Sequence, residues 1–263
     1  MTTMSIGKAW EEAVAFVARE AALLLPVALL FVALPGLIVQ EMAPPELQAW
    51  LAAPKAETMP DIPASYSLSI MIAVILIWFG SLTLFALALR PGISVKEALR
   101  LALTRLPVLL GTSLLAGVVL FGLLFLIVFG GVLLGMVAGP ALAVLVGAVA
   151  VVAMVFIGVR LSLLNPVVID RQDGVIVSLR QAWALTRGHF WRLLAFLAVM
   201  MILSTIVGSA AQVVIGLLGG LVAGPDGARL AGGLAAAAVS SVIQVYMLVM
   251  LARLYRQADA SAR

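Results

Sequence analysis

The stretch LPVLLGTSLLAGVVLFGLLFLIVFGGVLLGMVAGPALAVLVGAVAVVAMVFIGV, residues 106–159, decides the fold. It lies between Arg105 and Arg160, and none of its 54 residues is charged. Because about 20 helical residues cross a bilayer core about 30 Å thick, the stretch predicts two membrane-spanning helices joined by a turn. Glycine and proline favour such a turn, and they gather in the middle of the stretch. They are Gly130, Gly131, Gly135, Gly139 and Pro140.

The rest of the chain continues this pattern. Four further uncharged stretches each have the length of one crossing, at residues 21–40, 62–89, 193–225 and 230–252. Hydrophobic residues make up 64% of the 263-residue chain and charged residues only 11%, which is far from the composition of a soluble domain. We therefore expect an all-α, polytopic membrane protein with six transmembrane helices. Residues 1–263 are expected to form one integral membrane domain.

The distribution of Lys and Arg predicts the orientation of these helices, because positive residues accumulate in short cytoplasmic segments. With six spans, fourteen bases fall on one side, and only Lys55 and Arg229 fall on the other. We therefore expect both termini in the cytoplasm. Residues 1–20 lack the pattern of a removable signal peptide, so the first span is expected to remain. The fourteen bases are Lys8, Arg19, Arg90, Lys96, Arg100, Arg105, Arg160, Arg171, Arg180, Arg187, Arg192, Arg253, Arg256 and Arg263.

The composition also excludes several kinds of site. The chain has no cysteine, which removes disulfides, thiolate metal sites and cysteine nucleophiles. Its single histidine, His189, cannot form a histidine-rich metal cluster. We expect no metal, no cofactor and no nucleic-acid partner.

A short segment recurs before each odd-numbered span, as SIGKAW (5–10), SVKEAL (94–99) and SLRQAW (178–183). Serine favours a helix start, and the apolar residues that follow recur at helical spacing. Each copy therefore predicts an amphipathic helix in the cytoplasmic interface, with a lipid-facing apolar stripe and a basic face. Three copies of one interfacial helix plus two spans, at about 5–90, 94–164 and 178–254, predict a parallel, pseudo-threefold repeat. Chance similarity among interfacial segments is the competing interpretation.

Residues 160–170 (RLSLLNPVVID), Gly174 and residues 178–192 (SLRQAWALTRGHFWR) resemble a known family. They are similar to the membrane domain associated with some bacterial glycerophosphoryl diester phosphodiesterases and to its stand-alone YciC-like relatives. The resemblance implies a multi-span protein of the bacterial inner membrane. In fused members of that family the phosphodiesterase reaction belongs to a separate soluble domain, so we do not expect hydrolase activity here.

The same region contains the main candidate site. Arginine grips phosphate oxygens with two parallel hydrogen bonds, so bases beside the bilayer can bind a lipid headgroup. Equally, bases and aromatic residues next to a span can serve only as topology anchors. The candidate headgroup ligands are Arg160, Arg180, Arg187, His189 and Arg192.

A second candidate is a break after the fourth span. Proline disfavours helix in the residue before it, so Asn165 and Pro166 are expected to end or break that helix. Arg160 is then expected to pair with Asp170 or Asp173 across the turn. The alternative is an ordinary helix end with an arginine that extends to the headgroups.

Two polar residues inside the last two spans, Gln212 and Gln244, are a third candidate. They have the chemistry to coordinate a solute. Small and polar side chains also join packed membrane helices, which is the structural interpretation. No acidic residue lies mid-span, and this argues against a proton- or sodium-coupled transporter.

These patterns predict a non-enzymatic inner-membrane protein of envelope or lipid homeostasis. Its basic cytoplasmic face is expected to contact anionic phospholipids, and either a protein partner or a further copy of the chain. One alternative is a lipid or amphiphile transporter with a pathway near helices four to six. Another is a membrane-embedded lipid enzyme that uses His189 and Asp170.

Overall fold

The computed structural model describes residues 5–52, 60–138, 140–171 and 173–262. Within these ranges every regular element is a helix, as the sequence predicts. Five helical stretches are long and apolar enough to cross a membrane, which identifies a membrane protein. The elements are α1 (Ile6–Ala28), η1 (Leu29–Ala33), α2 (Leu34–Glu41), α3 (Pro45–Ala52), α4 (Ala64–Leu89), α5 (Val95–Ala138), α6 (Pro140–Leu161), α7 (Leu164–Asp170), α8 (Val175–Leu185) and α9 (Phe190–Ala262).

Helix α9 contains a reversal of the chain at Ala223 and Gly224, whose backbone angles are not helical. Gly224 has a φ of +68°, a conformation that glycine adopts without strain. The two arms of α9 pack closely on each other, since a Cβ placed on Gly219 would lie 2.5 Å from the carbonyl oxygen of Gly227. The chain therefore reverses between the last two uncharged stretches, 193–225 and 230–252.

The turn between α5 and α6 differs from the expectation. Helix α5 continues to Ala138, so Gly130, Gly131 and Gly135 are helical and do not form a turn. Gly131 instead permits close packing of α6, because a Cβ there would lie 2.4 Å from the side chain of Val146. Close helix contact, not chain reversal, explains this glycine. Gly139 lies outside the described residues.

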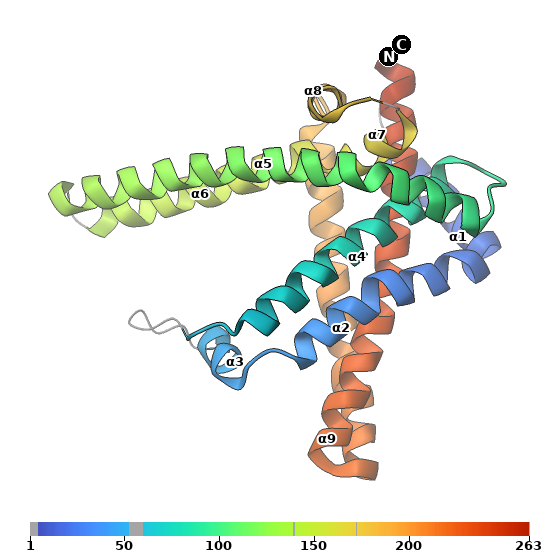
Figure 1. The fold of residues 1–263 in the computed structure, drawn as a ribbon, viewed down its shortest axis with the longest axis horizontal. Helices are drawn as coiled ribbons and strands as arrows, with labels where there is room; N and C mark the ends of the chain where they lie inside the picture. Colours follow the sequence, from blue (N-terminus) through green and yellow to red (C-terminus); the bar gives the residue numbers. More distant parts are fainter. Residues whose placement is uncertain (1–4, 53–59, 139, 172, 263) are drawn as a thin grey trace.

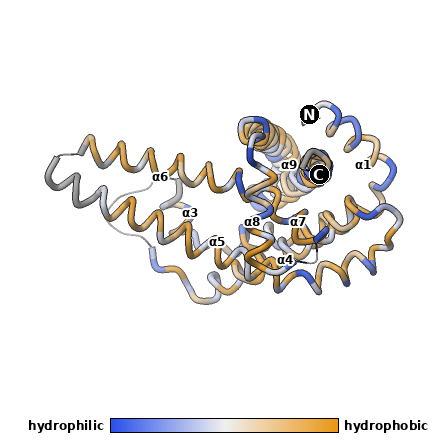
Figure 2. Tube along the Cα trace, turned by 90° about the horizontal axis from the view of Figure 1, so that it is seen from above, coloured by the Kyte–Doolittle hydropathy of each residue, from blue (hydrophilic) through white to orange (hydrophobic). Residues whose placement is uncertain are grey.

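Three helical pairs spread out from a common junction (Figure 1). The first pair is α1–η1–α2 with α4, the second is α5 with α6, and the third is formed by the two arms of α9. Both ends of each pair lie at the junction, where α7 and α8 and both chain ends are also found (Figure 1). Seen from above, α5 and α6 project away from the junction and are hydrophobic along most of their length (Figure 2).

The hydrophobic core lies at this junction. It combines residues from both halves of α1, the second half of α4, most of α7 and the last part of α9. Helix α7 is the most enclosed element, with Val167, Val168 and Ile169 at most 1% exposed. The segment between the second and third pairs is thus a buried core helix, although the sequence predicted only a loop with a helix break.

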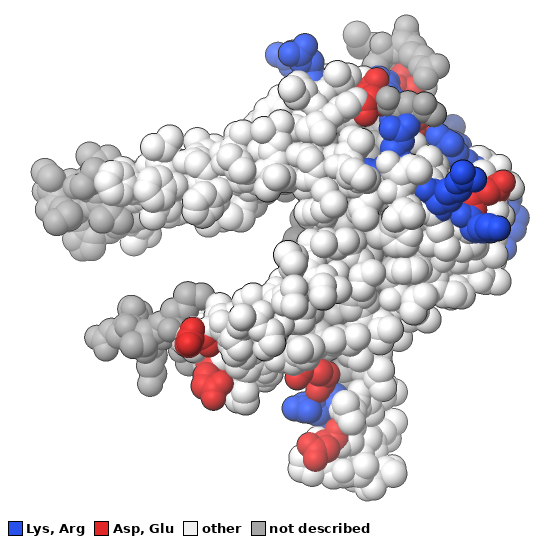
Figure 3. Space-filling view, in the orientation of Figure 1, with Lys and Arg blue, Asp and Glu red and all other residues white. Residues whose placement is uncertain are grey.

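The basic residues gather at the junction (Figure 3). At the far end of the molecule, Arg229 at the tip of α9 forms an ion pair of 3.0 Å with Glu41 at the end of α2. Lys55 and Arg263 lie outside the described residues. The two ends of the molecule therefore differ strongly in positive charge.

The three predicted interfacial helices are only partly separate elements. The first two copies are the opening turns of α1 and α5, which run on into their spans without a break. The third copy, α8, is a separate helix, followed by a turn in which Gly188 has a φ of +85°. An amphipathic segment directly followed by an apolar run can extend as one helix, and only the third copy has a glycine between the two.

Candidate functional site

The candidate site is the basic end of the molecule, where α7 holds the helical pairs together. Helix α6 ends at Leu161 and α7 begins at Leu164, so the break precedes Asn165 and Pro166. Pro166 lies in the first turn of α7, where a proline costs no helical hydrogen bond. The break therefore turns the chain into the buried helix α7.

Arg160, the last base of α6, lies among aromatic rings. Its guanidinium carbon is 5.1, 5.3 and 5.9 Å from the ring centres of Phe156, Trp183 and Phe190. One of its nitrogens also lies 3.5 Å from the hydroxyl of Thr186. The expected ion pair with Asp170 or Asp173 is wrong, because cation–π contacts from α8 and α9 occupy the guanidinium instead.

The two acidic residues contact other partners. Asp170, at the end of α7, accepts a hydrogen bond of 2.7 Å from the hydroxyl of Tyr255. Asp173 accepts one of 2.7 Å from the side-chain amide of Gln181. Neither acid is near His189 in any contact of the described chain, and a buried ring nitrogen of His189 has no hydrogen-bond partner there.

A second polar cluster joins α7 to the last turns of α9. Arg171 forms an ion pair with Asp259 and also contacts Tyr255. Burial acts to lower the pKa of Arg171, but the hydrogen bonds with Tyr255 and Asp259 outweigh it and raise the pKa. The guanidinium therefore stays charged and fixes the end of α9 against α7.

Two further arginines bind carbonyl oxygens at helix ends. Arg256 donates to the carbonyl of Leu89, at the end of α4. Arg90 lies 3.5 Å from the carbonyl oxygen of Ile169, near the end of α7. A positive charge at a helix C-terminus is favourable because the last carbonyls have no helical partner.

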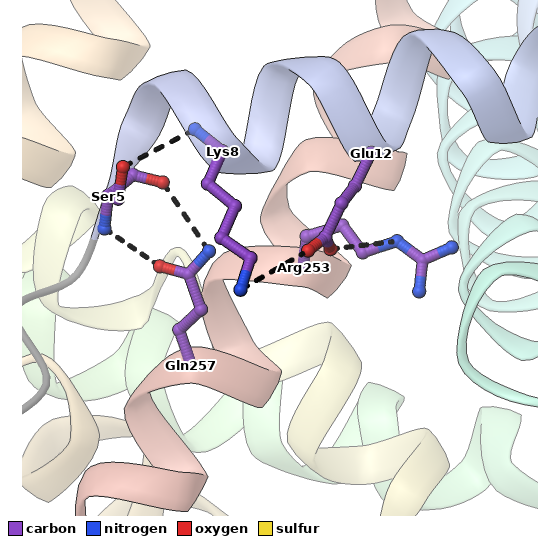
Figure 4. A network of polar contacts seen from close by, with 5 residues as sticks. All are labelled: Ser5, Lys8, Glu12, Arg253 and Gln257. Atoms are coloured by element: carbon purple, nitrogen blue, oxygen red, sulfur yellow. Dashed lines mark hydrogen bonds and ion pairs between the residues drawn. The ribbon is translucent and has the colours of Figure 1, made fainter.

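The first and last helices are joined by a network of polar contacts (Figure 4). The side-chain oxygen of Gln257 accepts a hydrogen bond of 2.8 Å from the backbone nitrogen of Ser5. Glu12 lies 4.0 Å from Lys8 and 3.9 Å from Arg253, and Arg253 lies over the ring of Phe16. The start of α1 thus packs on the end of α9, and this contact joins the first helical pair to the third.

The three repeated segments share one packing position. The alanine of each copy, Ala9, Ala98 and Ala182, is 0% exposed. The residues one helical turn later, Ala13, Ala102 and Thr186, are also 0% exposed. The side of each segment that carries these residues therefore faces protein, whereas the sequence predicted an apolar stripe that faces lipid. Small side chains at these positions allow the helices to approach closely. Trp10 and Trp183, at 45% and 41% exposed, lie on the surface, as do the bases Lys8, Lys96 and Arg180 of the motif.

The serines of the motif are less alike. Ser5 caps α1 by accepting a hydrogen bond from the backbone nitrogen of Lys8. Ser94 and Glu97 cap α5 reciprocally, through bonds of 3.3 and 2.8 Å. Ser178 lies inside α8 and is buried, with no partner for its hydroxyl in the described chain. The expected cap is therefore absent in the third copy, because α8 begins three residues earlier.

The bases at the junction fall into two groups. Arg90, Arg160, Arg171, Arg253 and Arg256 make the contacts above and hold helices together. The second group lies on the exposed surface. It includes Lys8, Arg19, Lys96, Arg100, Arg180, Arg187 and Arg192. Of the predicted headgroup ligands, Arg180, Arg187 and Arg192 belong to the exposed group, whereas Arg160 and His189 are partly buried.

Gln212 lies on the first arm of α9 and Gln244 on the second. A Cβ on Gly232 would lie 2.7 Å from the backbone oxygen of Gln212, so the arms touch at this level. Gln244 is partly buried. No side-chain hydrogen bond joins these two glutamines in the described residues.

Sequence reasoning did not select Glu12, Tyr255 or Gln257 as important residues. Each is a polar residue in a mostly apolar or basic segment next to a span, and such a position indicates a candidate for a polar contact between helices. The partners of Tyr255 and Gln257, however, lie 85 and 252 residues away in the chain.

The comparisons with known proteins add one finding. The family described as "Domain of unknown function (DUF7847)" matches residues 4–258, almost the whole chain. No curated protein and no solved structure matches the chain.

Proposed function

Since the chain belongs to the DUF7847 family, whose description assigns no activity, we propose a function from the residues themselves. The protein is a non-enzymatic, multi-pass protein of the bacterial inner membrane that binds anionic lipid headgroups at its basic end. Through this binding it acts in lipid or envelope homeostasis. The resemblance of residues 160–192 to the membrane domain of bacterial glycerophosphoryl diester phosphodiesterases favours the same membrane.

The observation that carries this proposal is the division of bases at the junction. The packed arginines contact neighbouring helices, whereas the second group presents its positive charge on the exposed surface. Exposed bases beside a bilayer attract anionic lipid, with about 1 kcal/mol for each. A surface that carries exposed bases on all three helical pairs favours lipid headgroups as the ligand.

The proposed topology has six spans, which are α1–η1–α2, α4, α5, α6 and the two arms of α9. Both ends of every pair lie at the basic end, so the positive-inside rule puts that end, with both termini, in the cytoplasm. The fully buried alanines of the three repeated segments support a parallel repeat with pseudo-threefold arrangement.

The proposal is tested by lipid analysis of the protein in native nanodiscs. We expect phosphatidylglycerol to be enriched around the wild type relative to the bulk membrane. A triple variant, Lys96→Gln, Arg100→Gln and Arg187→Gln, should lose most of this enrichment, because it removes three exposed charges. Arg229→Gln, at the opposite end, is the matched control and should retain it. Equal lipid composition around the wild type and in the bulk membrane would refute the proposal.

A further inference from the structure

A groove lies beside the exposed helix α8, between α5, α6 and α8, with a volume of about 400 Å³. Its wall is almost entirely apolar and includes Ala116 and Leu120 of α5 and Ile157 of α6. Arg180 and Trp183 of α8 line it as well. The groove thus combines a surface for a hydrocarbon chain with a positive charge and an indole ring, at the basic end of the molecule.

The tryptophan wall of this groove is held in place by its neighbours. Arg180 and Trp183 are three residues apart on α8, so they lie on the same helix face. The ring of Trp183 packs edge-on against Phe156 with ring centres 5.9 Å apart, and the guanidinium of Arg160 lies 5.3 Å from its centre. Arg160 therefore fixes the indole from behind and adds a second positive charge near the groove. A ligand that enters does not have to order this wall.

A comparable groove at the first repeated segment lacks the charge. It lies between α1 and α9, has a volume of about 460 Å³ and is lined by Trp10, Met200 and Met250 among other apolar residues. No charged side chain lines it. The two grooves thus share a tryptophan at the same motif position, and only the groove beside α8 offers a partner for a phosphate.

We propose that the groove between α5, α6 and α8 binds one anionic glycerophospholipid, with an acyl chain along α5 and α6 and the phosphate on Arg180. Charge complementarity identifies this occupant, because a guanidinium and an apolar trough match the two halves of such a lipid. The inference rests on the proposed function, and it adds a single defined site to a surface that otherwise attracts lipid diffusely. Trp183 lies at the headgroup level, as tryptophan does at membrane interfaces.

The test is native mass spectrometry of the purified full chain with phosphatidylglycerol or phosphatidylcholine. The wild type should retain one phosphatidylglycerol in preference to phosphatidylcholine. Arg180→Gln should lower that preference about fivefold, and Arg180→Lys should keep most of it, because the charge remains. Lys8→Gln, which changes another exposed base and leaves this groove intact, is the matched comparison and should lower the preference less than Arg180→Gln does.

The apolar half of the site is tested separately. Ala116→Trp fills the groove and should reduce retention of both lipids. Val118→Trp changes an exposed residue on another face of the same helix and should not. If Ala116→Trp impairs folding, as judged by circular dichroism, the comparison of Arg180→Gln with Arg180→Lys still decides.

The outcomes separate the two proposals. Equal losses in Lys8→Gln and Arg180→Gln would overturn the groove site while leaving diffuse lipid binding intact. A dimer mass that Ala116→Trp converts to a monomer would make a second copy the occupant and would also overturn it. No preference for phosphatidylglycerol in the wild type would overturn the proposed function together with the groove site.

Discussion

Arg160 shows what the sequence reveals about a single residue and what it leaves out. Its place at the end of an uncharged stretch predicted a base at the cytoplasmic end of a helix, and the structure has it at the end of α6. The predicted acidic partner was wrong, since the guanidinium lies among Phe156, Trp183 and Phe190. Two of these rings come from α8 and α9, so the contact depends on how separate helices pack, which no local pattern encodes.

This contact predicts that Arg160→Lys destabilises the protein although the charge is kept. Lysine lacks the planar guanidinium that stacks on several rings, and we expect a loss of about 1 kcal/mol. The unfolding midpoint in detergent should fall by about 2–4 °C. Arg187→Lys, on the exposed surface, should leave the midpoint unchanged. Identical midpoints for both variants would contradict the proposed role of the rings.

Tyr255 gives a second prediction at this scale. The residue is 1% exposed and its hydroxyl donates to Asp170 at 2.7 Å. Tyr255→Phe removes that bond and should lower the free energy of unfolding by about 1–2 kcal/mol, measured by thermal or denaturant unfolding. Tyr246→Phe is the control, because the Tyr246 ring packs on Trp10 and its hydroxyl has no partner in the described chain. A larger loss in Tyr246→Phe would rule out the hydrogen bond as the cause.

The apolar parts of the long helices could be predicted, because each is an uncharged stretch between charges. α4 was expected at 62–89 and is found at Ala64–Leu89. The glycines at 130–135 were wrongly read as a turn, because glycine serves both reversals and close helix contacts, and only the position of α6 distinguishes them. The core helix α7 was missed, since seven residues between two polar segments show no clear helical period.

The repeated alanines allow a test of the packing between elements. Ala182→Leu places a larger side chain at a position with 0% exposure, and such overpacking costs about 1–3 kcal/mol. The variant should unfold at a lower temperature than the wild type. Ala184→Leu adds the same side chain two residues along α8, on the exposed face, and should have little effect. Equal behaviour of the two variants would show that Ala182 is not a close packing point.

On the scale of the whole molecule, the join between α1 and α9 is open to a direct test. The chain contains no cysteine, so an introduced pair can be cross-linked without background. Ser5→Cys combined with Gln257→Cys should be joined by a short bis-maleimide, because these residues are in contact. Ser5→Cys combined with Gly227→Cys, at the tip of α9, should remain uncrosslinked. A product of equal yield from both pairs would mean that the helices do not pack as described.

The same join constrains how the protein is made. Ala9 and Ala13 lie in the part of α1 whose polar contacts reach Arg253 and Gln257 of α9, and these two residues are synthesised near the end of the chain. At ordinary rates of translation, the first helix must wait roughly 10–50 s for this partner. During that time its inner face is shielded only by lipid or by the cell's insertion machinery. A ribosome that stalls within α9 would therefore leave a membrane-inserted chain in which the start of α1 has no helix to pack on.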